Sequence, residues 1–201
     1  MNKKRTTDNK NIYIIDDALS DRARFKIKNI LDNSTRFTIG DQTSTSVTEA
    51  SSYSNFTCVL DEEKNKVLGI IDTIYAKLKW LPHNEDKVTA RIIARFMGHI
   101  FHLTHDNLNI CQATDDLEKL AHLTVVCFTN YFWNTTDGGD LLFADSTGDL
   151  DLAISNKPGR IVIFDSTIPF KFSPTIHNKN DPQYIYIASL SRPYSNNELK
   201  S

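Results

Sequence analysis

Short apolar runs separated by polar turns dominate the second half of the chain. The run Leu123–Phe128 is β-branched and aromatic, and it is too short and too punctuated for a helix. Three further runs follow it closely, at Leu141–Phe143, Leu150–Ile154 and Ile161–Phe164. The segment Tyr184–Leu190 alternates between apolar and polar positions, as a half-buried strand does. Strands at this spacing predict an antiparallel barrel or jelly roll.

The first half of the chain carries two amphipathic helical patterns behind a short strand at Asn11–Ile15. The first helix has Ser20 or Asp21 as its expected N-cap. Its apolar face is Ala23, Ile27, Ile30 and Leu31. The second helix is expected over Asp61–Leu78, with an apolar stripe formed by Val67, Leu68, Ile71, Ile74, Tyr75 and Leu78. Both helices are expected to pack on one face of the β-structure.

The remaining elements are expected to be strands and loops. Strands are predicted near Arg36–Ile39 and Ser54–Val59, with a loop over Gln42–Ser52 between them. The apolar stretch Val88–Leu103 reads as a strand, although ARIIARFMGHI also fits a helical period. A hairpin turn at 104–107 and a return strand at Leu108–Ala113 would follow it.

Length and composition indicate one soluble domain. The chain has 201 residues, 40% hydrophobic and 24% charged, with a net charge of −2. We expect a disordered tail at residues 1–10, one domain over 11–190 and a polar tail at 191–201. The charge favours neither nucleic acid nor an anionic membrane. No apolar run approaches the ~20 residues that span a bilayer. Three scattered cysteines and a basic, polar N-terminus without a signal-peptide pattern predict a cytoplasmic protein.

The pattern T-V-V-x-x-x-N-x-x-W-N-x-x-x-G-G-D begins at Thr124, and K-P-G-R-x-V-x-F-x-x-x-I-P begins at Lys157. Together they resemble the prolyl-4-hydroxylase-like oxygenases, which depend on Fe(II) and 2-oxoglutarate. The resemblance implies an α+β, mainly β fold: a double-stranded β-helix (jelly-roll, cupin-like) with the two helices on one face.

The resemblance also implies a site. The family holds iron with an H-x-D motif and a distal His after the I-P, two imidazoles and one carboxylate on one face of the metal. A late Lys or Arg pairs with the far carboxylate of 2-oxoglutarate. An ungapped count back from Thr124 places the H-x-D motif on Gln112-Ala113-Thr114. The distal His position is Phe170, and the basic position falls at Gln183 or Tyr184.

None of these positions carries the expected residue, so the resemblance predicts a degenerate iron site. Asp115, Asp116 and His177 are the candidates that would rescue a metal site. Further histidines are His83, His99, His102 and His105. Cys111 is expected to be a buried inert thiol.

Three functions follow from this site. The first is a non-standard or inactive member of the fold that binds a small molecule or peptide in a pocket lined by Gln112, Thr114, Phe170, Gln183 and Tyr184, with no metal. The second is an active 2-oxoglutarate-dependent hydroxylase with unorthodox iron ligands. The third is an interaction module that partners an active relative.

Overall fold

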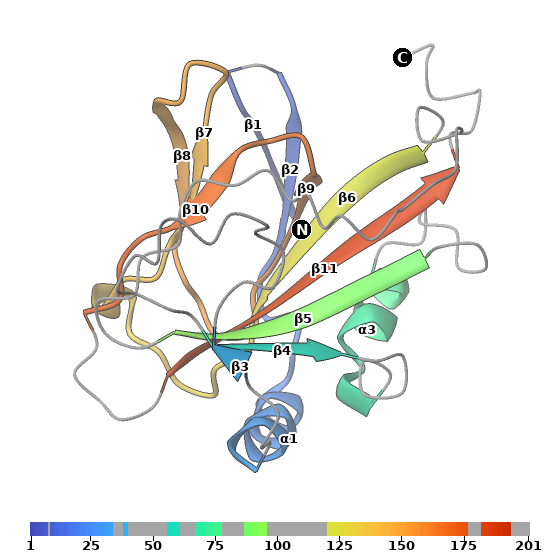
Figure 1. The fold of residues 1–201 in the computed structure, drawn as a ribbon, viewed down its shortest axis with the longest axis vertical. Helices are drawn as coiled ribbons and strands as arrows, with labels where there is room; N and C mark the ends of the chain where they lie inside the picture. Colours follow the sequence, from blue (N-terminus) through green and yellow to red (C-terminus); the bar gives the residue numbers. More distant parts are fainter. Residues whose placement is uncertain are drawn as a thin grey trace.

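The computed structural model describes residues 1–7, 9–33, 38–39, 56–60, 67–77, 87–95, 120–176 and 182–193. Within them the chain forms a large and a small antiparallel sheet and two α-helices (Figure 1). The large sheet contains, in spatial order, β1 (Asn2–Arg5), β2 (Asn11–Ile15), β9 (Ile161–Asp165), β6 (Leu120–Phe128), β11 (Gln183–Pro193), β5 (Lys87–Arg95), β4 (Phe56–Leu60) and β3 (Thr38–Ile39). The small sheet contains β10 (Phe170–Phe172), β7 (Leu141–Ala144) and β8 (Leu150–Ile154). The expectation of a mainly β, antiparallel fold is confirmed.

Strand β11 organises the large sheet. It pairs with β5 on one side and with β6 on the other. Successive side chains of a strand point to opposite faces, so Ile185 and Ile187 lie on one side and Tyr184 and Tyr186 on the other. The predicted strand at Tyr184–Leu190 is present and extends further at both ends.

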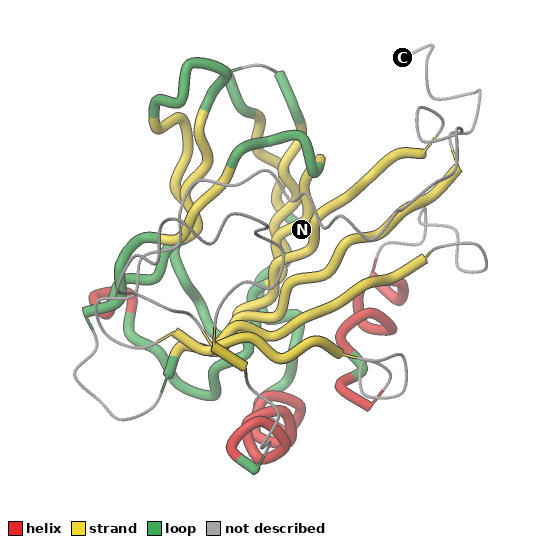
Figure 2. The backbone as a smooth tube through the Cα atoms, viewed as in Figure 1, coloured by secondary structure: helices red, strands yellow, loops and turns green. Residues whose placement is uncertain are grey.

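The helices α1 (Asp21–Asp32) and α3 (Ile70–Lys77) cover one face of the large sheet, as predicted (Figure 2). The Ser20 side chain accepts a hydrogen bond from the Ala23 backbone N–H at 3.3 Å, which confirms the expected N-cap. The buried helical residues that contact the sheet side chains are Ile27 and Leu31 of α1 and Ile70, Ile71, Ile74 and Tyr75 of α3.

A second core fills the space between the two sheets, and we call it the interior. It is built from alternate positions of the central strands, such as Ile93, Val126 and Ile185, and from the small sheet. Five phenylalanines, all fully buried, pack there edge to face: Phe128, Phe143, Phe164, Phe170 and Phe172.

Several elements differ from the sequence-based expectations. The expected disordered tail at 1–10 contains β1, which pairs with β2 and is exposed along its length. Because β1 buries no side chain, the hydrophobic pattern carried no sign of it. The strand β10, also not expected, has only three residues. Strand β11 continues to Pro193, into the segment expected to be a polar tail.

The second expected helix and the expected strand that begins at Val88 are described over parts of their expected ranges. The second helix is described over Ile70–Lys77, and residues 61–66 and 78 of its expected range lie outside the described residues. Val67 is exposed rather than part of the apolar stripe. The stretch that begins at Val88 is a strand as far as Arg95, where the helical alternative is wrong. The loop at 42–52, the turn at 104–107 and the strand at 108–113 lie outside the described residues.

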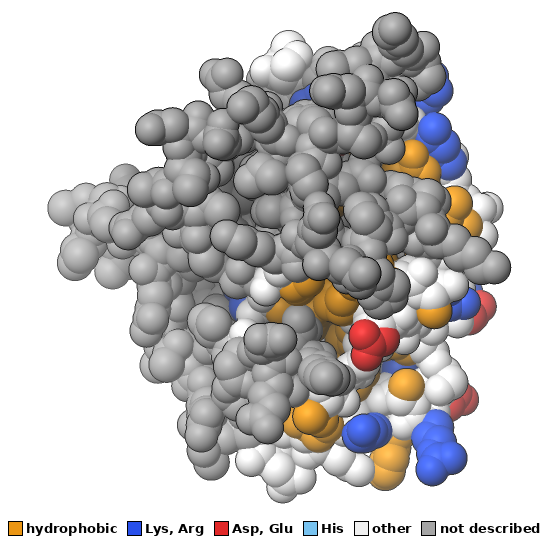
Figure 3. All heavy atoms as spheres, turned by 90° about the vertical axis from the view of Figure 1, so that its right-hand side faces the viewer, with side chains coloured by type: hydrophobic (Ala, Val, Ile, Leu, Met, Phe, Trp, Pro, Cys, Tyr) orange, Lys and Arg blue, Asp and Glu red, His pale blue; other side chains and the backbone are white. Residues whose placement is uncertain are grey.

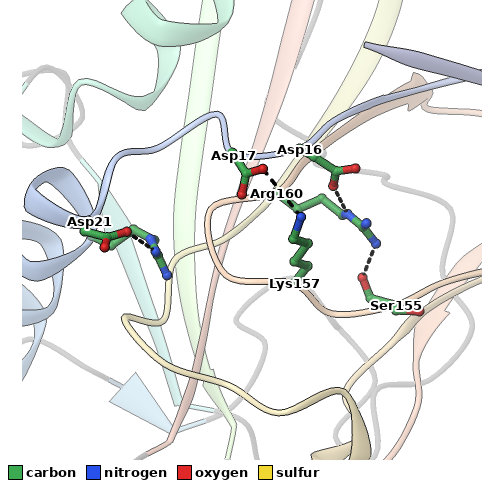
Figure 4. Close-up of polar contacts among 7 residues, drawn as sticks. Asp16, Asp17, Asp21, Ser155, Lys157 and Arg160 are labelled. Carbon is green, nitrogen blue, oxygen red and sulfur yellow. Dashed lines mark hydrogen bonds and ion pairs between the residues drawn. The ribbon is translucent and has the colours of Figure 1, made fainter.

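The K-P-G-R turn at residues 157–160 forms polar contacts with the segment that joins β2 to α1 (Figure 4). Arg160 Nε donates to Asp16 Oδ1 at 2.6 Å, and Lys157 Nζ lies 3.5 Å from Asp17 Oδ2. The carbonyl of Gly159 accepts from the backbone N–H groups of Ala18 and Leu19 at 3.0 and 3.3 Å. The segment between β2 and α1 is thereby fixed onto the turn that precedes β9.

Candidate functional site

Phe170, which the resemblance aligned with the family's distal histidine, is a core residue. It is fully buried in β10, and its ring centroid lies 5.2 Å from that of Phe164 and 6.1 Å from that of Phe172. A phenyl ring has no atom that binds iron, and this one packs edge to face against other rings. The described contacts of Phe170 are therefore those of a core residue.

Gln183, which the ungapped count aligned with the family's basic residue, faces the interior and is fully buried. Its Oε1 accepts from Arg95 Nη1 at 2.7 Å, and its Nε2 donates to the Gly139 carbonyl at 2.9 Å. Arg95 stands directly opposite Gln183 in the pairing of β5 with β11. A buried cation is thus present on the neighbouring strand, in contact with Gln183.

The Arg95 guanidinium is fully buried. Its Nη2 donates to the Ser173 carbonyl at 2.9 Å, and its Cζ lies 5.3 Å from the Phe172 ring centroid. Burial lowers the pKa of Arg95 to about 10, so the side chain remains charged at neutral pH. Sequence analysis missed this residue. The alternation of side chains along the strand could have identified it. Ile92 and Ala94 face the helices, so Arg91, Ile93 and Arg95 face the interior.

Tyr184 lies on the other face of the large sheet. Its side chain belongs to the core beneath the helices, and its hydroxyl bonds to Asp32 Oδ1 of α1 at 3.1 Å. It does not line the interior, so of the two positions expected for the cation only Gln183 faces that side.

The G-G-D turn that closes this end of the interior requires its two glycines. Gly138 and Gly139 have φ of +74° and +76°. A Cβ on Gly139 would lie 2.4 Å from Gln183 Nε2, and one on Gly138 would lie 2.3 Å from the Pro174 carbonyl oxygen. Trp133, which is buried, donates from Nε1 to the Gly138 carbonyl at 3.0 Å. The turn is therefore packed directly against Gln183.

The other expected site residues lie outside the described residues: Gln112, Thr114, Asp115, Asp116, His177 and Cys111. Among the described residues, no group of three His, Cys, Asp or Glu side chains is arranged to hold a metal ion. The described part of the interior contains the buried guanidinium of Arg95.

Comparison with solved structures identifies the fold. The chain superposes on a prolyl-4-hydroxylase from Pseudomonas putida with a TM-score of 0.62 and 13% identity, covering 90% of this chain and 92% of that one. The viral collagen prolyl hydroxylase of Paramecium bursaria Chlorella virus-1, solved with 2-oxoglutarate, gives 0.57 and 14%, covering 90% and 95%. A prolyl hydroxylase from Trichoplax adhaerens, solved with a peptide fragment of hypoxia inducible factor, gives 0.57 and 15%, covering 94% and 87%.

The fold is therefore that of the prolyl-4-hydroxylase-like oxygenases, as the sequence resemblance predicted. At these identities the likeness establishes the fold alone. No family model matches the chain, and no curated protein matches it.

Neither described helix has the length and apolar character that crossing a bilayer demands. On the face shown in Figure 3, described Lys and Arg side chains are spread among hydrophobic and uncharged ones, with a few carboxylates between them.

Proposed function

We propose that this protein is a non-standard member of the oxygenase fold that lacks the usual iron triad. It binds a small molecule, or part of a peptide, that carries a carboxylate, inside a double-stranded β-helix. The observation that carries the proposal is Arg95, a fully buried cation in an otherwise largely apolar interior.

Removing a guanidinium from water costs several kcal/mol unless it is well paired, and a ligand carboxylate would add a charged partner to the hydrogen bonds that Arg95 makes with Gln183 and Ser173. The planar fork of the guanidinium matches the geometry of a carboxylate. Arg91 lies four residues earlier on the same strand face and is also buried. Two guanidinium groups directed into one interior favour an anionic ligand over a neutral one.

The altered positions support the metal-free part of the proposal. Phe170 occupies the distal ligand position with a ring, and Gln183 replaces the cation with an amide. The viral relative was solved with 2-oxoglutarate and the Trichoplax relative with a peptide, so the fold accommodates both kinds of ligand. We further propose a reducing, cytoplasmic setting, in which the buried thiols of Cys58 and Cys127 stay reduced.

The test is calorimetric titration with 2-oxoglutarate, glutarate and the neutral dimethyl ester of 2-oxoglutarate. At least one dicarboxylate should bind, and the ester should not. Arg95→Gln should weaken binding about 10- to 100-fold, because a charged hydrogen bond contributes about 1.5–3 kcal/mol. Arg22→Gln, which removes an exposed arginine of α1, is the control for net charge.

The double variant Arg95→Gln/Gln183→Arg separates the role of the charge from the stability of the strand pair. It exchanges the two facing side chains and keeps both chemical groups in the interior. Binding should return to within a few-fold of the parent protein. Equal affinity for the ester and the diacid, or equal losses in the Arg95 and Arg22 variants, would refute the proposal.

A second candidate function is an active hydroxylase with unorthodox ligands. His177 and either Asp115 or Asp116 would hold the iron in this candidate. Iron with 2-oxoglutarate would supply C–H hydroxylation. Stoichiometric iron after anaerobic purification with Fe(II), together with succinate formation, would establish this candidate and end the first one. Titrations without any binding would favour the interaction module.

A further inference from the structure

Asn156 is a fully buried polar residue whose side chain has no hydrogen bond within the part of the chain that the structure describes. Both Nδ2 and Oδ1 are inaccessible and without a partner. Asn130 is the contrasting case, since its Nδ2 donates to the Pro182 carbonyl at 3.0 Å and its Oδ1 accepts from the Tyr184 N–H at 2.8 Å. Asn130 therefore has a structural role that Asn156 lacks.

A buried amide without hydrogen-bond partners lowers the stability of the folded protein. Leaving a donor or acceptor without a partner costs about 1–3 kcal/mol, whereas an apolar side chain of the same shape would avoid that cost. A ligand group that forms hydrogen bonds with both Nδ2 and Oδ1 would explain why an asparagine stands at this position. Such a group must donate one hydrogen bond and accept another.

The position of Asn156 connects it to Arg95. It follows the inward-facing Ile154 of β8 by two residues, and its backbone N–H donates to Asp140 Oδ1 at 2.8 Å. The Asp140 N–H in turn donates to Ser173 Oγ at 2.8 Å, and the Ser173 carbonyl accepts from Arg95 Nη2 at 2.9 Å. Three successive hydrogen bonds thus link the amide residue to the buried cation at one end of the interior.

We propose that Asn156 determines the specificity of the interior site, by binding a hydroxyl or carboxamide group at the far end of the carboxylate that Arg95 holds. The inference rests on the proposed function and names its ligand class. The ligand is a short carboxylic acid with a hydrogen-bonding tail. A hydroxyl or a carboxamide both donates and accepts, as the two free atoms of Asn156 require.

The experiment compares three monocarboxylates of similar length, which are pentanoate, 5-hydroxypentanoate and glutaramate. The parent protein should bind the two polar-tailed acids about tenfold or more tightly than pentanoate, the change that one lost buried hydrogen bond produces. Asn156→Leu should remove that preference while it keeps pentanoate binding within about threefold. Asn29→Leu, on the exposed side of α1, should change neither value.

Thermal unfolding distinguishes a ligand contact from a structural role. Asn156→Leu should unfold at the same or a higher temperature without ligand, because it removes two unsatisfied groups. A lower melting temperature with an unchanged ligand preference would assign the amide to a bound water and overturn the inference. If the parent protein binds none of the three acids and no dicarboxylate, the proposed function itself fails. If it binds them and Asn156→Leu keeps the preference, only this inference fails.

Discussion

At the scale of single residues, some buried side chains stabilise the fold, whereas the burial of others has a cost in free energy. Phe170 and Asn130 are buried with every group in contact or hydrogen bonded. The side chain of Asn156 is buried without a hydrogen bond among the described residues, and Arg95 places a charged group in a largely apolar core. The second pair is where stability and function are expected to conflict.

Phe170→Ala should lower the free energy of unfolding by about 3–5 kcal/mol, the usual cost of removing a buried aromatic ring. Denaturant titration measures the loss. Phe25→Ala is the matched control, because Phe25 is 54% exposed on α1 and should cost less than about 1 kcal/mol. Similar losses in both variants would contradict the assignment of Phe170 to the core.

At the scale of elements, two turns hold the strands in register. The G-G-D turn packs its backbone against Gln183, and the K-P-G-R turn binds the segment that precedes α1. Both motifs belong to the pattern on which the family resemblance rests. Their glycines and charges serve close packing, so both motifs have a structural role in this chain.

Gly139→Ala should destabilise the protein more than Gly148→Ala. Both glycines have positive φ, at +76° and +90°, so alanine is strained at either position. Only at Gly139 would the new Cβ also strike the Gln183 amide, whereas at Gly148 nothing lies within 4 Å. The difference between the two melting temperatures isolates that contact. Equal losses would show that the backbone conformation alone matters.

The Asp16–Arg160 pair should contribute stability that depends on pH. The hydrogen bond and positive charge of Arg160 hold the pKa of Asp16 below its usual value of 3.8. Its contribution is therefore fully present above that value and is lost as pH falls through the lowered pKa. Asp16→Asn should destabilise by at most ~1 kcal/mol at pH 7, since the pair is partly exposed.

The difference between Asp16→Asn and the parent protein should shrink as the solution is acidified. Asp17→Asn is the control, because Asp17 is mainly exposed and lies farther from its partner Lys157. A constant difference between Asp16→Asn and the parent from neutral pH down to pH 2 would show that the ion pair is not its cause.

At the scale of the whole molecule, the large sheet separates two cores with different roles. One face carries the helices and the Tyr184–Asp32 hydrogen bond, and the other carries the aromatic cluster and Arg95. Substitutions on opposite faces share no partners, so their effects should add.

Tyr184→Phe should therefore cost about 1 kcal/mol of stability, the value of one hydrogen bond, and leave carboxylate affinity unchanged. Chemical denaturation and calorimetric titration of the same variant test both parts. A change in affinity comparable to that of Arg95→Gln would show that the two faces are coupled.

Much of this architecture was readable from the residues alone. The period of two in β11, the apolar stripe of α1 with its Ser20 cap, and the spacing of the glycine motifs are local signals, because they depend on neighbours in the chain. They were sufficient for a mainly β, antiparallel fold with two helices on one face. An exposed strand such as β1 has no such signal.

The partnership of Arg95 with Gln183, and the isolation of the Asn156 amide, became visible only in three dimensions. The first pair is 88 positions apart in the chain and meets through strand pairing. The second depends on every neighbour that surrounds a side chain, which no local pattern encodes. Burial and hydrogen-bond satisfaction are properties of the packed molecule, and it is these properties that point to a ligand.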